Sequence, residues 1–196
     1  MAKREAVVDR KTKETQVRVE LKLDGTGAAQ VRTGIGFLDH MLDLFGKHGR
    51  FDLAVEATGD TEVDDHHTAE DVGIALGQAL DEALGDRAGI VRFGQASVPM
   101  DEALAEVALD LSGRGSLAFR VEFPQEKIGT YDAGLTREFL QALASNARMT
   151  LHVSSPSGDD GHHITEAVFK ALARALAMAV AADPRVRGVP STKGVL

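Results

Sequence analysis

The stretch 66–70, His-His-Thr-Ala-Glu, decides the fold of this chain, because it returns at 162–166 as His-His-Ile-Thr-Glu. On an α-helix, the first histidine and the glutamate of each copy lie at i and i+4 and share one face. The second histidine lies about 100° further around the helix. Each copy can therefore offer a His-Glu pair to one metal ion and a second histidine to another. The pattern predicts a pair of metal sites, for which the candidate ligands are His66, His67, Glu70, His162, His163 and Glu166.

Segments that match one another accompany both copies in the same order, so the pattern belongs to a longer internal duplication. A run that alternates apolar and less apolar residues and then reaches glycine is typical of a strand that ends in a turn. Such a run occurs in each half, and a second strand-like run follows it. A chance likeness between two amphipathic halves does not explain glycine, histidine and glutamate in matching positions. The matching segments are 19–27 with 107–115, 37–38 with 139–140, 50–55 with 148–153, and 59–60 with 158–159.

The duplication predicts an α+β fold of two similar halves, 1–90 and 91–196, the second of which ends in a substrate-binding tail. Each half reads strand, strand, helix, strand, helix. We expect each to form a small, mostly antiparallel sheet with helices packed on one face. Apolar residues at helical spacing follow both motifs, so each motif occupies the first turn of a long helix. The second helix is expected to end near Asp183-Pro184, where proline cannot continue it.

The composition of the chain narrows the classes of function. The net charge of −8 argues against a nucleic-acid partner, because phosphate backbones require clustered Lys and Arg. The chain has no cysteine, so disulfides and thiolate sites are excluded and a metal has to be held by His and carboxylate ligands. The apolar runs are too short to span a bilayer, and no secretory signal follows Met1. We therefore expect a cytoplasmic protein without a membrane partner.

Two further histidines are candidate ligands. His40 lies in the segment 36–42, and His152 lies on the second strand-like run of the second half. With them, six histidines and two glutamates suffice for two metals that keep open coordination positions, as catalytic sites do. The simpler alternatives are a polar helix start at the surface and a histidine satisfied in the core. The remaining histidine, His48, is interpreted as a surface or substrate residue and not as a ligand.

Several cations lie beside turn or terminal signals and are candidates for binding an anion. Arg92 follows the first long helix, and Arg114 lies in the glycine-containing turn 111–115. In the tail 190–194, hydroxyl groups, backbone amides and one lysine come together, a combination that suits a phosphate. The alternatives are that each arginine is a solvated surface charge and that the tail is a frayed terminus. The tail candidates are Ser191, Thr192 and Lys193.

Combined, these segments resemble the imidazoleglycerol-phosphate dehydratase family of histidine biosynthesis. The resemblance covers nearly the whole chain. The chain departs from the usual pattern of the family at Leu44 and at Gly115-Ser116, and the stretch 129–135 is not among the segments that carry the resemblance. The segments that carry the resemblance are 36–42, 65–71, 92–94, 99–102, 110–114, 162–170 and 190–194.

The resemblance implies a reaction, a cofactor and an assembly. The reaction is the dehydration of imidazole glycerol phosphate to imidazole acetol phosphate, with two Mn(II) ions per active site. The assembly is a homo-oligomer of 24 subunits whose active sites lie between subunits. The implied metal ligands are His40, His66, His67, Glu70, His152, His162, His163 and Glu166. The implied substrate-binding residues, which mainly contact the phosphate, are Glu14, His48, Arg92, Arg114, Lys170, Ser191, Thr192 and Lys193.

The chemistry of this reaction is demanding, because the proton that is removed sits on a carbon without an adjacent carbonyl. An imidazole ring can take up the electrons if it loses its own N–H. Two Lewis-acidic metals, one at each ring nitrogen, are expected to stabilise the imidazolate and a diazafulvene-like intermediate. Glu14 is the candidate for proton transfer, because it is the carboxylate of the matched set least committed to a metal.

Two other classes of function are compatible with the residues alone. The first is a dinuclear metallohydrolase that acts on a small phosphorylated substrate. The second is a non-enzymatic metal-binding shell, which would need the His-His-Glu copies but not the cations.

Overall fold

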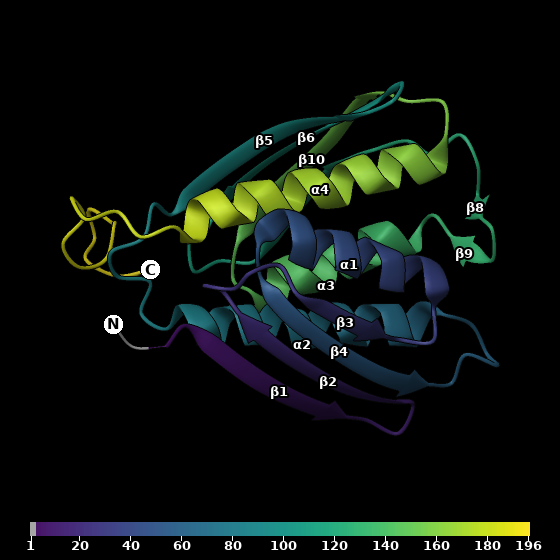
Figure 1. Cartoon of the computed structure of the whole chain (residues 1–196), viewed down its shortest axis with the longest axis horizontal. Helices are drawn as coiled ribbons and strands as arrows, with labels where there is room; N and C mark the ends of the chain where they lie inside the picture. The colour runs from purple at the N-terminus through teal and green to yellow at the C-terminus, as the bar shows by residue number, and fades with distance from the viewer. Residues whose placement is uncertain (1–2) are drawn as a thin grey trace.

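The computed structural model describes residues 3–196, and its elements repeat in the same order in both halves (Figure 1). Each half runs strand, strand, strand, helix, strand, helix, and the second half adds a short hairpin before its first helix. The first half contains β1 (Glu5–Lys11), β2 (Thr15–Lys22), β3 (Ala29–Arg32), α1 (Gly36–Gly49), β4 (Asp52–Gly59) and α2 (His66–Leu84). The second half contains β5 (Phe93–Met100), β6 (Ala103–Asp110), β7 (Ser116–Arg120), β8 (Lys127–Ile128), β9 (Tyr131–Asp132), α3 (Leu135–Asn146), β10 (Thr150–Ser157) and α4 (Gly161–Val180).

The two main sheets have equivalent topologies. Their strand orders are β1-β2-β4-β3 and β5-β6-β10-β7, and the short β8–β9 hairpin is an addition to the second half. In each sheet two neighbouring pairs are antiparallel, while the edge strand β3 or β7 pairs in parallel with β4 or β10. The predicted α+β fold of two similar, mostly antiparallel halves is therefore confirmed. The edge strands β3 and β7 were absent from the predicted order.

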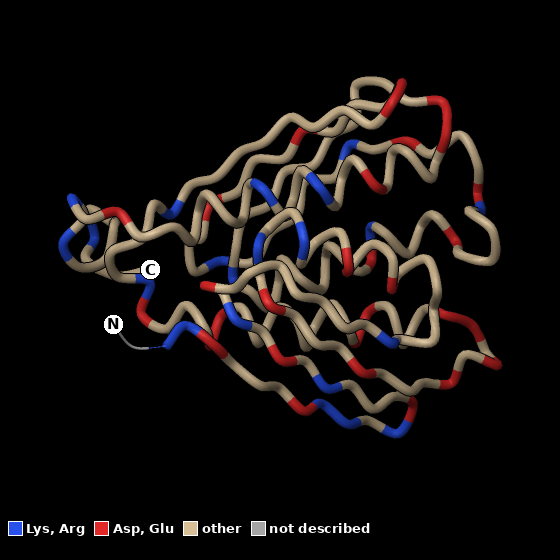
Figure 2. Tube along the Cα trace, viewed as in Figure 1, with Lys and Arg blue, Asp and Glu red and all other residues tan. Residues whose placement is uncertain are grey.

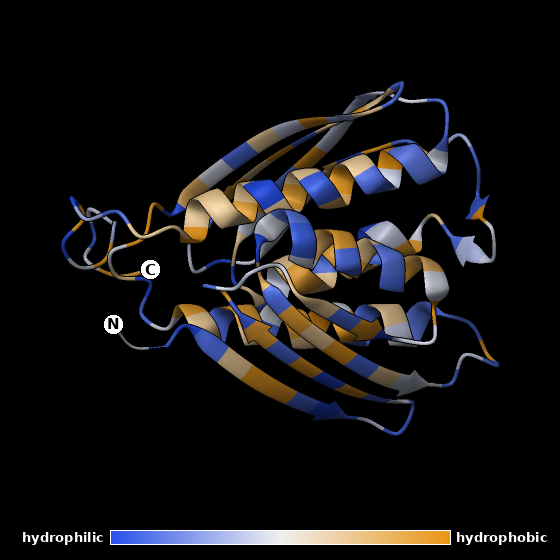
Figure 3. Ribbon diagram, in the orientation of Figure 1, coloured by the Kyte–Doolittle hydropathy of each residue, from blue (hydrophilic) through white to orange (hydrophobic). Residues whose placement is uncertain are grey.

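The molecule is built in layers, with the helices between the two sheets (Figure 1). Helices α1 and α2 pack on the first sheet, and α3 and α4 pack on the second. The two helix layers then pack against each other, α2 on α3 and α1 on α4, and one buried apolar cluster runs through both halves. Strands and helices both alternate apolar and polar residues in Figure 3, as partly covered elements must.

Only one face of each sheet is covered. Along β2, the residues Thr15, Val17, Val19 and Leu21 are buried, and the residues between them are exposed. Strand β6 shows nearly the same alternation. Because side chains alternate between the faces of a strand, the helices cover one face and the other face of each sheet lies open.

All four helices begin at the same end of the molecule, on the right in Figure 1. The first turns of α2 and α4, which carry the two His-His motifs, therefore lie at one end but in different layers. Helix α4 ends at Val180, shortly before Pro184, as the sequence predicts. The C-terminal tail lies at the opposite end of the molecule. Across residues 3–196, every helix is too short or too polar to cross a membrane.

The connection between the halves is anchored by Arg87, a buried arginine that follows α2. Its guanidinium donates to the backbone carbonyls of Leu111, Ala147 and Arg148, all in the second half, at 2.9–3.1 Å. The same group forms an ion pair with Asp81 of α2. Carbonyls at element ends that would otherwise lack partners are thereby satisfied by one charged donor.

We predict that Gly94→Ala destabilises the fold, because helix α4 crosses strand β5 in direct contact with this glycine. A Cβ added at Gly94 would overlap the carbonyl oxygen of Ala175, a backbone atom that cannot move without shifting α4. Overpacking of this kind costs about 1–3 kcal/mol. The matched control is Gly36→Ala at the start of α1, where nothing lies within 4 Å. Denaturant unfolding measures both variants, and equal stability of the two would contradict the prediction.

Candidate metal centre and substrate-binding residues

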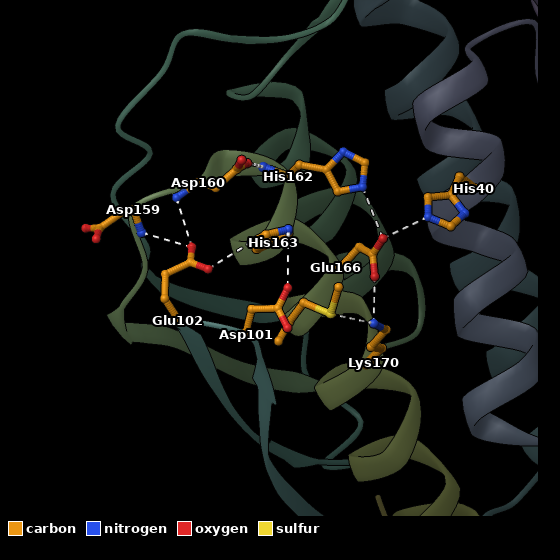
Figure 4. A network of polar contacts seen from close by, with 10 residues as sticks. His40, Asp101, Glu102, Asp159, Asp160, His162, His163, Glu166 and Lys170 are labelled. Carbon is orange, nitrogen blue, oxygen red and sulfur yellow. Dashed lines mark hydrogen bonds and ion pairs between the residues drawn. The ribbon is translucent and has the colours of Figure 1, made fainter.

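The carboxylate of Glu166 is the centre of a polar cluster that joins α1 and α4 (Figure 4). Its Oε1 lies 2.9 Å from His40 Nε2 and 3.1 Å from His162 Nε2. Its Oε2 accepts a hydrogen bond of 2.6 Å from Lys170 Nζ. Burial alone would raise the pKa of Glu166, but the hydrogen bonds from Lys170, His40 and His162 outweigh it and lower the pKa to about 2. The carboxylate is therefore ionised at neutral pH.

The ligand atoms of His40, His162 and Glu166 all lie within 4.8 Å of one another. Across residues 3–196, this is the only group of three or more His, Asp or Glu side chains that could hold a metal ion in this way. Two imidazole nitrogens and one carboxylate oxygen suit Mn, Fe, Co, Ni or Zn. The cluster combines a residue from each half of the chain, since His40 belongs to the first half and Glu166 to the second.

Two aromatic side chains hold His162 in place. The ring of Phe37 meets His162 edge to face at a centroid distance of 5.0 Å, and Tyr131 packs on Phe37 at 5.1 Å. Tyr131 is fully buried, and burial raises its pKa well above the usual value. It lies in the stretch 129–135, which thereby supports the Phe37 ring that contacts His162. Phe37 and Tyr131 could not be predicted as site residues, because no spacing rule connects the three distant segments that carry them and His162.

The first motif forms a separate group at the start of α2. His67 Nδ1 lies 3.0 Å from the Asp60 carboxylate and 4.0 Å from Glu14 Oε2. The hydrogen bond to Asp60 raises the pKa of His67. His66 and Glu70 lie on the same first turns of the helix, and Glu70 is exposed. This group places Glu14 beside the first motif.

His163 is held by Glu102 and not by the Glu166 cluster (Figure 4). His163 Nδ1 lies 2.9 Å from Glu102 Oε2. The hydrogen bond with His163 lowers the pKa of Glu102 to about 2 and correspondingly raises the pKa of His163. The two histidines of the second motif therefore point to different partners, as their angular separation on a helix requires.

His152 lies on the outer face of the second sheet, away from the helices. It is exposed on β10, between Ala108 of β6 and Ala118 of β7. A shallow hollow of about 520 Å³ surrounds it, lined also by Arg120 and Ser154. Within one chain, His152 is thus separated by the sheet from the helix layer that carries His162 and His163.

Arg92 is occupied by contacts within the chain. Its guanidinium forms two hydrogen bonds with Asp110, of 2.7 and 3.0 Å, and a third of 2.7 Å to the carbonyl of Pro190. It also lies 4.7 Å from the ring centroid of Phe93. In this structure Arg92 therefore fixes the start of the tail.

The tail and Arg114 lie together at the end opposite the helix starts (Figure 1). A Cβ added at Gly113 would overlap the carbonyl carbon of Leu196, so the last residue passes directly over the turn that carries Arg114. Within the tail, Ser191 Oγ accepts a hydrogen bond of 3.2 Å from the backbone N–H of Lys193. Figure 2 shows basic residues around this tail and acidic residues in the loops at the other end.

One chain therefore brings together only part of the predicted site. It joins His40, His162, Glu166 and Lys170, and it places Glu14 next to His67. The first-motif residues lie on a separate helix, His152 lies on an open sheet face, and the tail lies at the far end.

Comparison with known proteins gives one consistent result. The family model described as imidazoleglycerol-phosphate dehydratase matches residues 33–176. The imidazoleglycerol-phosphate dehydratase of a Geobacillus species is 61% identical over 193 residues, which cover 98% of this chain and 99% of that protein. The crystal structure of the enzyme from Staphylococcus aureus matches with a TM-score of 0.83 and 41% identity, covering 91% of this chain and 99% of that chain. The crystal structure from Pyrococcus furiosus matches with a TM-score of 0.81 and 37% identity, covering 96% and 100%. The chain, which these relatives match over nearly its full length, belongs to the imidazoleglycerol-phosphate dehydratase family.

Proposed function

We propose that this protein is a metal-dependent hydro-lyase of histidine biosynthesis that converts imidazole glycerol phosphate to imidazole acetol phosphate in the cytoplasm. The observation that carries the proposal is the buried, ionised carboxylate of Glu166 between His40 and His162. A carboxylate that meets two imidazoles near the start of a helix suits a metal ion, and it lies in a chain that is 61% identical to a protein named for this reaction.

The active site of this proposal is completed by a second copy of the chain. Each repeat half, 1–90 and 91–196, supplies one His-His-Glu motif. The two motifs lie in different layers, and His152 and the tail lie elsewhere on the surface. The open outer faces of both sheets leave room for neighbouring copies. We propose a homo-oligomer, a 24-mer, in which a first motif of one copy faces a second motif of another.

The donor set fits Mn(II), two ions per active site, because it contains only imidazole nitrogens and carboxylate oxygens. When bound, such ions would supply Lewis acidity that favours loss of a proton from the substrate imidazole. The proposed ligands are His40, His66, His67, Glu70, His152, His162, His163 and Glu166.

The remaining residues orient the substrate and move its protons. Glu14, 4.0 Å from His67, transfers the proton at the carbon chain of the substrate. Arg92 holds the tail through Asp110 and Pro190, so that the hydroxyls and lysine of the tail can donate to a phosphate. The proposed substrate-binding residues besides Glu14 are His48, Arg92, Arg114, Lys170, Ser191, Thr192 and Lys193.

Turnover of the proposed substrate tests the function directly. The Mn(II)-loaded protein is expected to convert imidazole glycerol phosphate to the ketone product, to lose this activity with a chelator and to regain it with Mn(II). The measurement follows the ketone product and inorganic phosphate in the same sample. Release of inorganic phosphate would show a phosphohydrolase, and tight metal binding without turnover would show a metal-binding shell; either result contradicts the proposal.

We predict that Glu14→Gln leaves the metal content unchanged and lowers kcat by about 10²–10⁴-fold, the usual contribution of a general acid or base. The glutamine keeps the shape of the side chain but cannot accept the proton. Metal content by elemental analysis and steady-state kinetics are measured together, with the exposed Glu82→Gln as the control. A Glu14→Gln protein with full activity would remove Glu14 from the mechanism.

We predict that two inactive variants restore activity in each other when they assemble together. His67→Ala damages the first motif and His162→Ala the second, so a mixed assembly contains some sites with both motifs intact. The measurement is activity after co-expression of the two chains. Co-expression of His162→Ala with Glu166→Ala is the control, because every site then contains a damaged second motif. If both motifs of a site came from one chain, the first mixture would remain as inactive as the control.

A further inference from the structure

The side chain of Glu102 links the β5–β6 turn to the start of α4, beside the second motif (Figure 4). It lies in the tight turn between β5 and β6, directly before Ala103. Its Oε1 accepts hydrogen bonds from the backbone N–H groups of Asp159 and Asp160, at 3.2 and 3.1 Å, in the loop that leads into α4. Its Oε2 lies 2.9 Å from His163 Nδ1. Both oxygens are engaged, so the orientation of the carboxylate is fixed.

This orientation also fixes the ring of His163. An ionised carboxylate only accepts hydrogen bonds, so Nδ1 of His163 has to carry the proton and donate it. In neutral imidazole, Nε2 then keeps its lone pair. No hydrogen bond to Nε2 occurs among residues 3–196, and its ion-pair neighbour is the exposed carboxylate of Asp101 at 3.8 Å. Histidines that bind metals commonly donate their other N–H to a carboxylate, which orients the ring and raises its basicity.

We propose that Glu102 is a positioning residue that holds His163 with Nδ1 protonated and Nε2 presented to a metal ion. The inference rests on the proposed function only for the presence of that metal. Glu102 does not touch the substrate or the ion in this arrangement. Glu102 acts through His163. The hydrogen bonds from the backbone N–H groups of Asp159 and Asp160 hold the Glu102 carboxylate in place, so the carboxylate restrains the His163 ring.

In the first half, a different residue binds the second histidine of the motif. Glu14 is the counterpart of Glu102, since it directly precedes Thr15, the first residue of the equivalent strand β2. Its carboxylate, however, stays 4.0 Å from His67 Nδ1. The Nδ1 of His67 is bound instead by Asp60, at 3.0 Å, from the loop after β4. Because Asp60 anchors the histidine of the first half, Glu14 keeps its carboxylate available for proton transfer, whereas Glu102 is committed to anchoring.

The proposal predicts that Glu102→Gln weakens Mn(II) binding at one of the two classes of site by about 10–100-fold. The amide can satisfy the backbone N–H groups with its oxygen only by turning its NH₂ group toward Nδ1. Nδ1 then has to become an acceptor, which moves the proton to Nε2 and blocks the metal-binding nitrogen. Free Mn(II) is titrated against the protein and measured by electron paramagnetic resonance. The control is Glu82→Gln, which removes an exposed carboxylate near the end of α2. This variant is expected to bind Mn(II) like the unaltered protein.

A double-mutant cycle separates positioning from a structural role. If Glu102 acts through His163, Glu102→Gln adds no further loss of Mn(II) affinity in a His163→Ala protein. An equal loss in both backgrounds would show that Glu102 acts through the backbone loop and would overturn the proposal, as would unchanged affinity in the single variant. If Glu102→Gln fails to fold, Glu102→Asp provides the test, with a smaller loss that also has to vanish in the His163→Ala background. The titration needs no substrate. The proposal for Glu102 can therefore be contradicted while the unaltered protein still converts its substrate, so it is tested separately from the proposed function.

Discussion

The packing of two helix pairs between two sheets is the constraint on which the rest of the structure depends. Each helix packs on a sheet on one side and on another helix on the other, so its buried face is apolar. A charged side chain that is buried between these layers needs a partner, and Asp71, Arg87 and Glu166 all form ion pairs. Glu166 is only 7% exposed, and contacts with His40, His162 and Lys170 stabilise its charge. Ions bound near it would meet a carboxylate that is already ionised and oriented.

Much of this fold could be predicted from the sequence, because the duplication makes each sequence pattern occur in both halves. Glycine ends of strands, the His-His-Glu starts of helices and Pro184 after α4 are local signals that need no knowledge of distant contacts. The strands β3 and β7 were missed for a physical reason. Each is short and pairs in parallel with a strand that follows only after a helix. The sequence therefore contains no hairpin turn that would indicate the pairing.

The candidate site was predictable by residue type and not by contact. His40, His162 and Glu166 were all expected as ligands, and the structure brings these three together. The carboxylates that orient the second histidine of each motif, Asp60 and Glu102, could not be assigned from spacing, because they reach it from separate loops. Arg92 was predicted to bind an anion, but its pairing with Asp110 and with the tail could not be predicted. No periodicity connects these segments.

The equivalent places of Glu14 and Glu102 have a consequence for how such a protein can evolve. A symmetric dimer of one ancestral half would carry every substitution in both copies, so its two carboxylates could not take different tasks. Fusion of the halves into one gene removes that restriction, and each copy can then change alone. The two halves can therefore hold equivalent histidines with different carboxylates, Asp60 in the first half and Glu102 in the second.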